Sequence, residues 1–538
     1  MMDIPGEVPP ISHLYIGITP GEIQTKKRPK TRVQKTLNTT PMKLLNGITR
    51  RKPREYPNTC LIDRLPPEIL VYIFQLCLPT SSTIREILFS SNGSTWNGKR
   101  QSWISAREAP LNVSHVCAAW RNIAIESQAL WKMICFQGSI RRNGVDSEFD
   151  AISTFLKRSS TSPINIFIRL RAPLDLTLLE SDRAVDPFRC IGLLMAEKAR
   201  WRSVNLSFDR SALLEPFMRV LENEVLPVEE LFVDCTIFRN GPQHFAPRLY
   251  NLKTLHFKSR DNHSFVSWTT SHCPPLKELS LFFSVPLNDF FSWLDNCPTL
   301  ESIKLKNIFL PQTINIDHDS LKVRHMPHLK ELSLGIGIAL LEADMAKRAI
   351  DLILHSVQAP SLKSLSLSFN SRPDAFCDLE SIVTSLRASQ SSSLKSLRLR
   401  GFGCNKHTNG AQILCHLMNL TPTLETLLID EASERSMFSH LSTLPSLHMY
   451  WPVLRTIHFA TKRPETPPIH DWLGFVKQFM RNREDKSSLH QVVIHAPEHS
   501  RSKVEHALSE EPYKSWRTLS VGLDIKFSEY SEEKIDNL

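Results

Sequence analysis

The sequence lacks the features that mark a membrane protein or a disulfide-rich secreted protein. No apolar run is long enough to span a bilayer, and the first residues, MMDIPGEVPP, lack the basic-then-apolar order of a signal peptide. The 11 cysteines form no C-x-x-C pair, so neither a zinc site nor a disulfide framework is predicted. We therefore expect no membrane partner and a reducing compartment, the cytoplasm or the nucleus.

Catalytic motifs are also absent from the sequence. There is no G-x-S-x-G, no G-x-x-x-x-G-K-[ST] and no H-E-x-x-H. Glycines follow expected strands in LSLGIGIAL (332–340) and GFG (401–403), but neither has the third glycine of a dinucleotide-binding loop. We therefore predict a protein that is not an enzyme and uses no metal or cofactor.

Positive charge is concentrated at the N-terminus. Residues 1–58 hold 11 Lys/Arg against 4 Asp/Glu, which is most of the net charge of +10. The clusters KKRPK (26–30) and RRKPR (50–54) lie in a segment too poor in apolar residues to fold alone, so we predict a disordered basic arm. A nuclear import signal, a phosphate-binding patch and a solvated tail all fit it. Because a nucleic-acid role would rest on this arm alone, nucleic acid is not the expected partner.

Three short apolar helices are predicted between residues 65 and 136. LPPEILVYIFQLCLP (65–79) has prolines at the first helical positions and then an apolar face too wide for a solvated surface helix. A second helix is predicted after Ser114 as its N-cap, and a third from about Ser127 that includes Ile134. So few residues cannot bury all their apolar faces on one another, which favours docking of a partner helix; packing on the rest of the chain is the alternative.

This region resembles an F-box. LPPEIL, the helical IFQLCLP, V-C-x-x-W-R and a final LW carry the resemblance over about 45 residues. It implies that the domain, placed at 59–136, binds the Skp-type adaptor of a cullin–RING ubiquitin ligase. The docking positions it implies are Leu65, Pro66, Ile69, Leu70, Ile73, Phe74, Leu78, Leu111, Val113, Ser114, Val116, Cys117, Trp120, Arg121, Leu130 and Trp131.

Two features depart from the F-box pattern. Gln128 stands where the family usually has proline before its final Leu-Trp pair. Residues 79–109 separate the two blocks, where a few residues normally suffice. This insert is rich in Ser and Gly at its centre, so we predict a solvent-exposed loop that either permits or blocks adaptor docking.

A repeat of the form L-x-x-L-x-L fills the remainder, placed at 137–538. Copies start at residues 228, 252, 276, 300, 329, 362, 394, 424, 454 and 489, with looser ones at 201 and 516, and the starts lie 24–35 residues apart. Helical patterns follow several copies, as in 286–300, 351–362 and 410–424. A strand and a helical return in each unit predict an α/β solenoid, an irregular leucine-rich-repeat horseshoe. A doubly wound α/β sheet is the alternative, but its strands would be apolar on both faces.

CPPLKEL (273–279) and CPTLESI (297–303) resemble the cysteine-containing repeats of F-box proteins, in which a horseshoe commonly follows the F-box. The third, fifth and seventh positions of each strand should face outward, where solenoids bind partners or are simply solvated. The candidate substrate-binding residues at these positions are His256, Lys258, Phe282, Lys304, Lys306, Arg398, Arg400 and His458.

These observations predict the substrate-recognition subunit of an SCF-type cullin–RING ubiquitin ligase. Its expected partners are a Skp-type adaptor, a cullin and an unknown protein substrate. The alternative is a leucine-rich-repeat scaffold that binds protein without a ligase attached.

Overall fold

The computed structural model describes part of the chain, in segments. They are residues 61–89, 109–139, 145–171, 185–209, 211–235, 248–259, 274–309, 322–337, 351–370, 379–389, 393–402, 410–431, 451–460, 474, 476, 489–496, 502, 505–506, 509–510 and 524–529. The expected basic arm, 1–58, and residues 90–108 of the insert lie outside the described residues. The chain divides into two compact units, Met1–Arg64 and Leu65–Leu538. The described part of the first is the 3₁₀ helix η1 (Leu61–Arg64).

The second unit begins with a small helical region. Its elements are α1 (Pro67–Leu76), α2 (Ser81–Phe89), a helical turn at 109–114, α4 (Ala118–Glu126) and the 3₁₀ helix η3 (Gln128–Leu130). Helix α1 starts as predicted, because Pro67 is its first residue and the Glu68 carboxylate lies in its first turn. The N-cap of α4 is Cys117 rather than the predicted Ser114, and its Sγ accepts a hydrogen bond from the Trp120 amide at 3.4 Å.

Aromatic rings form the core of the helical region. The Phe74 ring of α1 lies 4.8 Å from the Trp120 ring of α4, centroid to centroid. Trp131 is fully buried, and its Nε1 donates to the Ala124 carbonyl at 2.7 Å, which ties the end of the region to α4. The third predicted helix ends early: η3 stops at Leu130, and Ile134 belongs to a strand.

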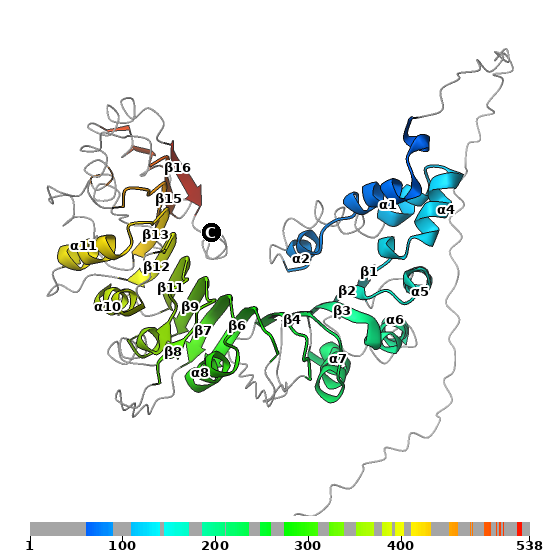
Figure 1. Ribbon diagram of the computed structural model, residues 1–538, viewed down its shortest axis with the longest axis horizontal. Helices are drawn as coiled ribbons and strands as arrows, with labels where there is room; N and C mark the ends of the chain where they lie inside the picture. The colour runs from blue at the N-terminus through cyan, green and yellow to red at the C-terminus, as the bar shows by residue number, and fades with distance from the viewer. Residues whose placement is uncertain are drawn as a thin grey trace, which may run out of the picture. The chain divides into compact units, whose positions relative to one another are not determined.

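A single sheet of fourteen described strands follows the helical region (Figure 1). Its strands are β1 (Met133–Ser139), β2 (Ile164–Arg171), β3 (Trp201–Phe208), β4 (Glu230–Cys235), β5 (Thr254–Ser259), β6 (Glu278–Pro286), β7 (Ser302–Phe309), β9 (Glu331–Gly337), β11 (Ser364–Asn370), β12 (Ser396–Phe402), β13 (Thr426–Glu431), β14 (Thr456–Ala460), β15 (Gln491–Ala496) and β16 (Asp524–Glu529). Each strand pairs in parallel with the next one along the chain. The described order contains no reversal, which a doubly wound sheet requires.

Helices and a small second sheet connect the strands. The helices are α5 (Val145–Ser159), α6 (Val185–Ala196), η6 (Lys198–Arg200), α7 (Ser211–Asn223), α8 (Leu287–Asn296), α10 (Leu379–Ser389) and α11 (Gly410–Leu420), and the second sheet joins β8 (Arg324–His325) to β10 (Val357–Gln358). In β6, Leu279 and Leu281 are buried, whereas Ser280 and Phe282 are half-buried. This alternation follows the predicted strand phase. We call the side formed by the third, fifth and seventh repeat positions the outward face.

Two predictions about the extent of the elements were wrong, and a third falls outside the described residues. The sheet starts at Met133, so the predicted boundary at 136/137 cuts through β1, and the repeat pattern missed both β1 and β2. The last strand, paired with β15, is Asp524–Glu529, whereas the copy predicted at 516–521 lies outside the described residues. The insert is not only a loop, because its residues 81–89 form α2. Ile84 of α2 is fully buried, which explains why this part of the insert is ordered against the sheet.

Candidate protein-interaction surfaces

Helix α1 is apolar on two sides, and one of them is exposed. Ile69, Tyr72 and Leu76 have 46%, 60% and 68% of their surface exposed. Their spacing of three and four residues places them along one side of the helix. We call these three residues the α1 stripe. Three large apolar side chains in a row on a ten-residue helix form the kind of surface that a partner protein covers.

Several residues predicted to dock the adaptor lie in the core instead. Leu70, Phe74, Ser114, Leu130 and Trp131 are all buried. A partner could reach them only by opening the domain, so we correct these five to core residues of the helical region. The Ser114 hydroxyl, for example, donates to the Leu111 carbonyl at 2.7 Å.

The remaining predicted docking residues are accessible to different degrees. Pro66, Ile69, Val116, Cys117 and Arg121 are exposed, and Val116 has 60% of its surface exposed. Half-buried positions are Leu65, Ile73, Leu78, Leu111, Val113 and Trp120. The predicted set left out Tyr72 and Leu76, which carry most of the exposed apolar surface of α1, although their spacing from Ile69 was visible in the sequence.

The outward face of β4–β6 carries a row of stacked rings. The Phe232 and His256 rings lie 5.5 Å apart at 21°, and the His256 and Phe282 rings lie 5.0 Å apart at 40°. Burial, together with the positive charges of Lys258, Arg85 and Lys304, lowers the pKa of His256 to about 4. The imidazole is therefore neutral at pH 7, and the row is an uncharged aromatic strip. His256 and Phe282 are half-buried and so accessible to a ligand.

The predicted lysines of this face lie around that strip. Lys258 and Lys304 are half-buried, and Lys306 is exposed. Lys304 Nζ pairs with Glu331 Oε1 at 2.9 Å, so part of its charge is satisfied within the sheet. Glu331 and Glu278, at the third repeat position, add acidic groups to this face.

Two candidates farther along the sheet are internal rather than accessible. Arg400 Nε lies 3.1 Å from Asp430 Oδ2 across β12 and β13, and both side chains are less than 10% exposed. His458 Nδ1 lies 3.0 Å from His495 Nε2, and the two buried rings stack at 10°. Burial, together with the charges of His495 and Arg398, lowers the pKa of His458 to about 4. We therefore correct Arg400 and His458 to structural residues; Arg398 is half-buried.

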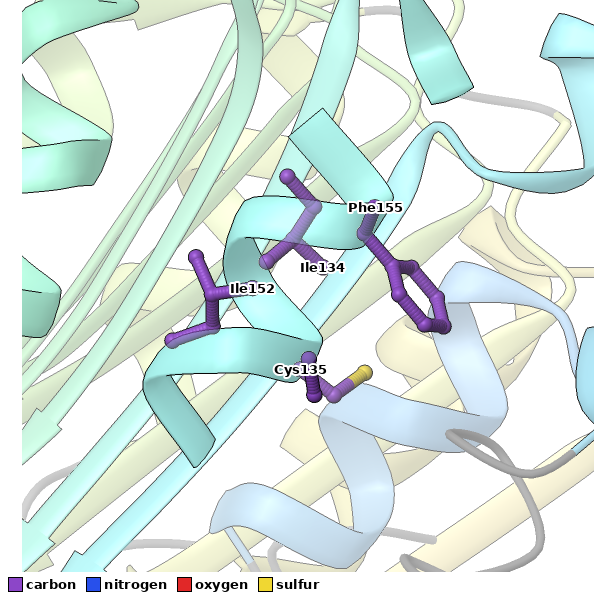
Figure 2. A pocket seen from close by; sticks show the side chains of 5 residues that line it. Ile134, Cys135, Ile152 and Phe155 are labelled. Atoms are coloured by element: carbon purple, nitrogen blue, oxygen red, sulfur yellow. The ribbon is translucent and has the colours of Figure 1, made fainter. Parts of the chain in front are cut away.

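The described residues include a small depression but no cluster of metal ligands. A depression between β1 and α5 is lined by Ile134, Cys135, Ala151, Ile152 and Phe155 (Figure 2) and has room for about one water molecule. Within the described segments, no three His, Cys, Asp or Glu side chains converge as metal ligands. No described helix combines the length and the apolar character needed to cross a membrane.

Comparison with known proteins identifies the helical region. Residues 62–137 match a family described as F-box-like, and no curated protein matches the chain. The matched range includes α1, α4 and η3 and ends within β1. The chain therefore has an F-box-like domain at residues 62–137, followed by a large, mostly parallel sheet.

Proposed function

We propose that this protein is the substrate-recognition subunit of an SCF-type cullin–RING ubiquitin ligase. The F-box-like domain binds the Skp-type adaptor, and the adaptor connects the chain to the cullin. The sheet binds a protein substrate and holds it near the catalytic subunits, so this chain contributes proximity rather than chemistry. Its site of action is the cytoplasm, the nucleus or both.

The α1 stripe is the observation that carries the adaptor-binding role. Ile69, Tyr72 and Leu76 are exposed on a helix whose opposite side, at Leu70 and Phe74, already packs in the core. Burying three such side chains against a partner contributes about 1.5–3 kcal/mol each before the costs of association. An F-box-like domain with such a surface is suited to a helical adaptor.

The strand order supports a leucine-rich-repeat solenoid as the substrate-binding part. Fourteen strands follow the chain order, and each pairs only with its sequence neighbours in the sheet. Backbone contacts repeat from unit to unit: the Lys277 amide donates to the Lys253 carbonyl at 2.7 Å, and the Glu301 amide to the Lys277 carbonyl at 2.7 Å. Units that contact only adjacent units define a solenoid, and its outward face is the surface on which such proteins bind ligands.

The test is capture of a purified Skp-type adaptor by the full chain. We expect Tyr72→Asp or Leu76→Asp to weaken capture by about 100-fold or more, because a charge in an apolar interface costs about 3–5 kcal/mol. Both side chains are exposed, so the variants should keep the melting temperature of the original chain.

Two further variants make this result specific. Asn419→Asp adds the same charge at an exposed position of α11 and should leave capture unchanged. Leu70→Asp should lose both capture and the fold of the domain, because Leu70 is only 4% exposed. Equal capture by the Tyr72→Asp, Leu76→Asp and original chains would contradict the adaptor-binding role. A chain that retains a protein ligand on its sheet but captures no adaptor would be the scaffold instead.

A further inference from the structure

A single guanidinium group is held on the outward face of β3 and β4. Arg85 of α2 donates from Nε to Asn205 Oδ1 at 3.1 Å and from Nη2 to Ser203 Oγ at 3.5 Å. Its Nη2 also forms an ion pair with Glu230, and its Cζ lies 3.8 Å above the centre of the Phe232 ring. A carboxylate, an amide oxygen and an aromatic face together satisfy the charge, the planar donors and the flat surface of arginine.

The sheet builds this site without help from α2. Ser203 Oγ donates to Glu230 Oε2 at 3.0 Å, and Asn205 Nδ2 donates to the Ile166 carbonyl at 3.2 Å and to Ser203 Oγ at 3.0 Å. Ser203 and Asn205 are 2% and 0% exposed. Because its nitrogen is engaged by the sheet, the Asn205 amide presents its oxygen to the cation. The acceptors are therefore oriented before any arginine arrives, which lowers the cost of binding one.

Few described side chains hold α2 in place. The helix has nine residues, and among its side chains that the structure describes only Ile84 is fully buried. Ser82 and Thr83 are exposed, and the Thr83 amide is capped by Thr80 Oγ1 at 3.2 Å. An isolated helix of this length is marginal in water. Among the described side chains of α2, Ile84 and Arg85 are the ones that contact the sheet.

The surface next to Arg85 extends along the outward face. The aromatic strip runs from Phe232 through His256 to Phe282, across three strands. Glu278 lies two strands from Glu230 in the same row of outward positions, is exposed, and also attracts the Arg85 charge. Because His256 is neutral at pH 7, it does not repel a bound cation. An arginine flanked by apolar residues matches this arrangement.

We propose that the outward face of β3–β6 is a recognition site for an arginine-bearing protein segment, and that α2 occupies it as an internal plug. Arg85 takes the position of the guanidinium of the incoming segment. This inference deepens the proposed substrate-recognition role and names the chemistry of the substrate segment. A plug tethered by a short linker acts at a local concentration of about millimolar, so an outside segment binds well only after α2 leaves.

The test uses a fluorescent peptide of residues 80–89, TSSTIREILF, as the probe. Its binding to the full chain is followed by fluorescence anisotropy. We expect Arg85→Ala to release the plug and to strengthen peptide binding at least tenfold over the original chain. A peptide with Gln in place of Arg85 should not bind. Glu230→Gln added to Arg85→Ala should abolish the gain, because it removes the charge that pairs with arginine while keeping an acceptor for Ser203.

A second variant guards against loss of the fold. Replacing residues 80–108 by a short Gly-Ser linker removes α2 entirely, and this chain should bind the peptide as tightly as Arg85→Ala. Absence of peptide binding to both opened chains, or binding that Glu230→Gln leaves intact, would overturn the proposal and make α2 a permanent brace. Adaptor capture by the same variants is measured separately. Loss of adaptor capture with intact peptide binding would refute only the ligase role.

Discussion

The side chains of β6 alternate between the core and the outward face, and substitutions at two adjacent residues test which of them is buried. Leu281 is 1% exposed, whereas Phe282 is half-buried and contacts the His256 ring. Leu281→Ala removes a buried side chain and leaves a cavity, which costs about 2–5 kcal/mol. Phe282→Ala removes a partly solvated ring and one ring contact, and such a contact contributes about 0.5–1.5 kcal/mol.

Urea unfolding followed by far-UV circular dichroism measures this difference. Leu281→Ala should shift the transition midpoint to lower urea with little change in slope, since the surface exposed on unfolding is nearly the same. Phe282→Ala should shift it much less, although this side chain is the larger of the two. Because a long sheet can unfold in parts, the comparison uses the transition in which the strands around β6 lose structure.

A loss of stability in Phe282→Ala that equals or exceeds the loss in Leu281→Ala would refute the assigned side-chain directions in β6. If Phe282→Ala cost as much as Leu281→Ala, residue 282 would be buried in solution and the outward face would not be the one described here. The proposed arginine site would then lose its aromatic strip, because Phe232, His256 and Phe282 are assigned to the same side of neighbouring strands.

Two other predictions test local packing and pH dependence. Gly335→Ala should destabilise the sheet, because a Cβ at this position of β9 would collide with the Lys306 carbonyl of β7. Gly192→Ala in α6 is the control: its Cβ would have open space, so the change should be neutral or stabilise the protein by up to about 1 kcal/mol. His458 has its pKa lowered to about 4 in the folded chain, so the unfolded chain binds a proton more readily and stability falls as pH drops from about 6.5 toward 4. His458→Gln should therefore lose less stability than the original chain between pH 7 and pH 5 in urea titrations.

The sequence predicted the repeated strands well because each strand has one buried and one outward side. Leucines such as Leu276, Leu279 and Leu281 are all buried, and the polar residues between them are not. The same rule failed for β1 and β2, whose sequences MICFQGS and INIFIRLR do not contain the L-x-x-L-x-L pattern. In β2, Ile166, Phe167 and Ile168 are all fully buried, so this strand is apolar on both sides rather than on one.

The functional surfaces were harder to predict, for a physical reason visible in α1. A resemblance assigns positions to a motif but does not separate a side chain that contacts a partner from one that supports the contact. Leu70 and Phe74 match the motif and are buried, whereas Tyr72 and Leu76 carry the exposed apolar surface. The spacing of Ile69, Tyr72 and Leu76 contained that information, but apolar residues on both sides of the helix concealed it.

The role of the insert depends on contacts between residues far apart in the sequence. Its Ser- and Gly-rich centre suggested a loop, whereas Thr80 and the apolar residues of TIREILF already contained a helix start and a buried residue at Ile84. The position of Arg85 follows from Asn205 and Glu230, which lie 120 and 145 residues away. No local pattern identifies such a partner, because a lone arginine on a short helix is normally solvated. The buried acceptors Ser203 and Asn205 on β3, together with the half-buried carboxylate of Glu230 on β4, distinguish this arginine from a surface one.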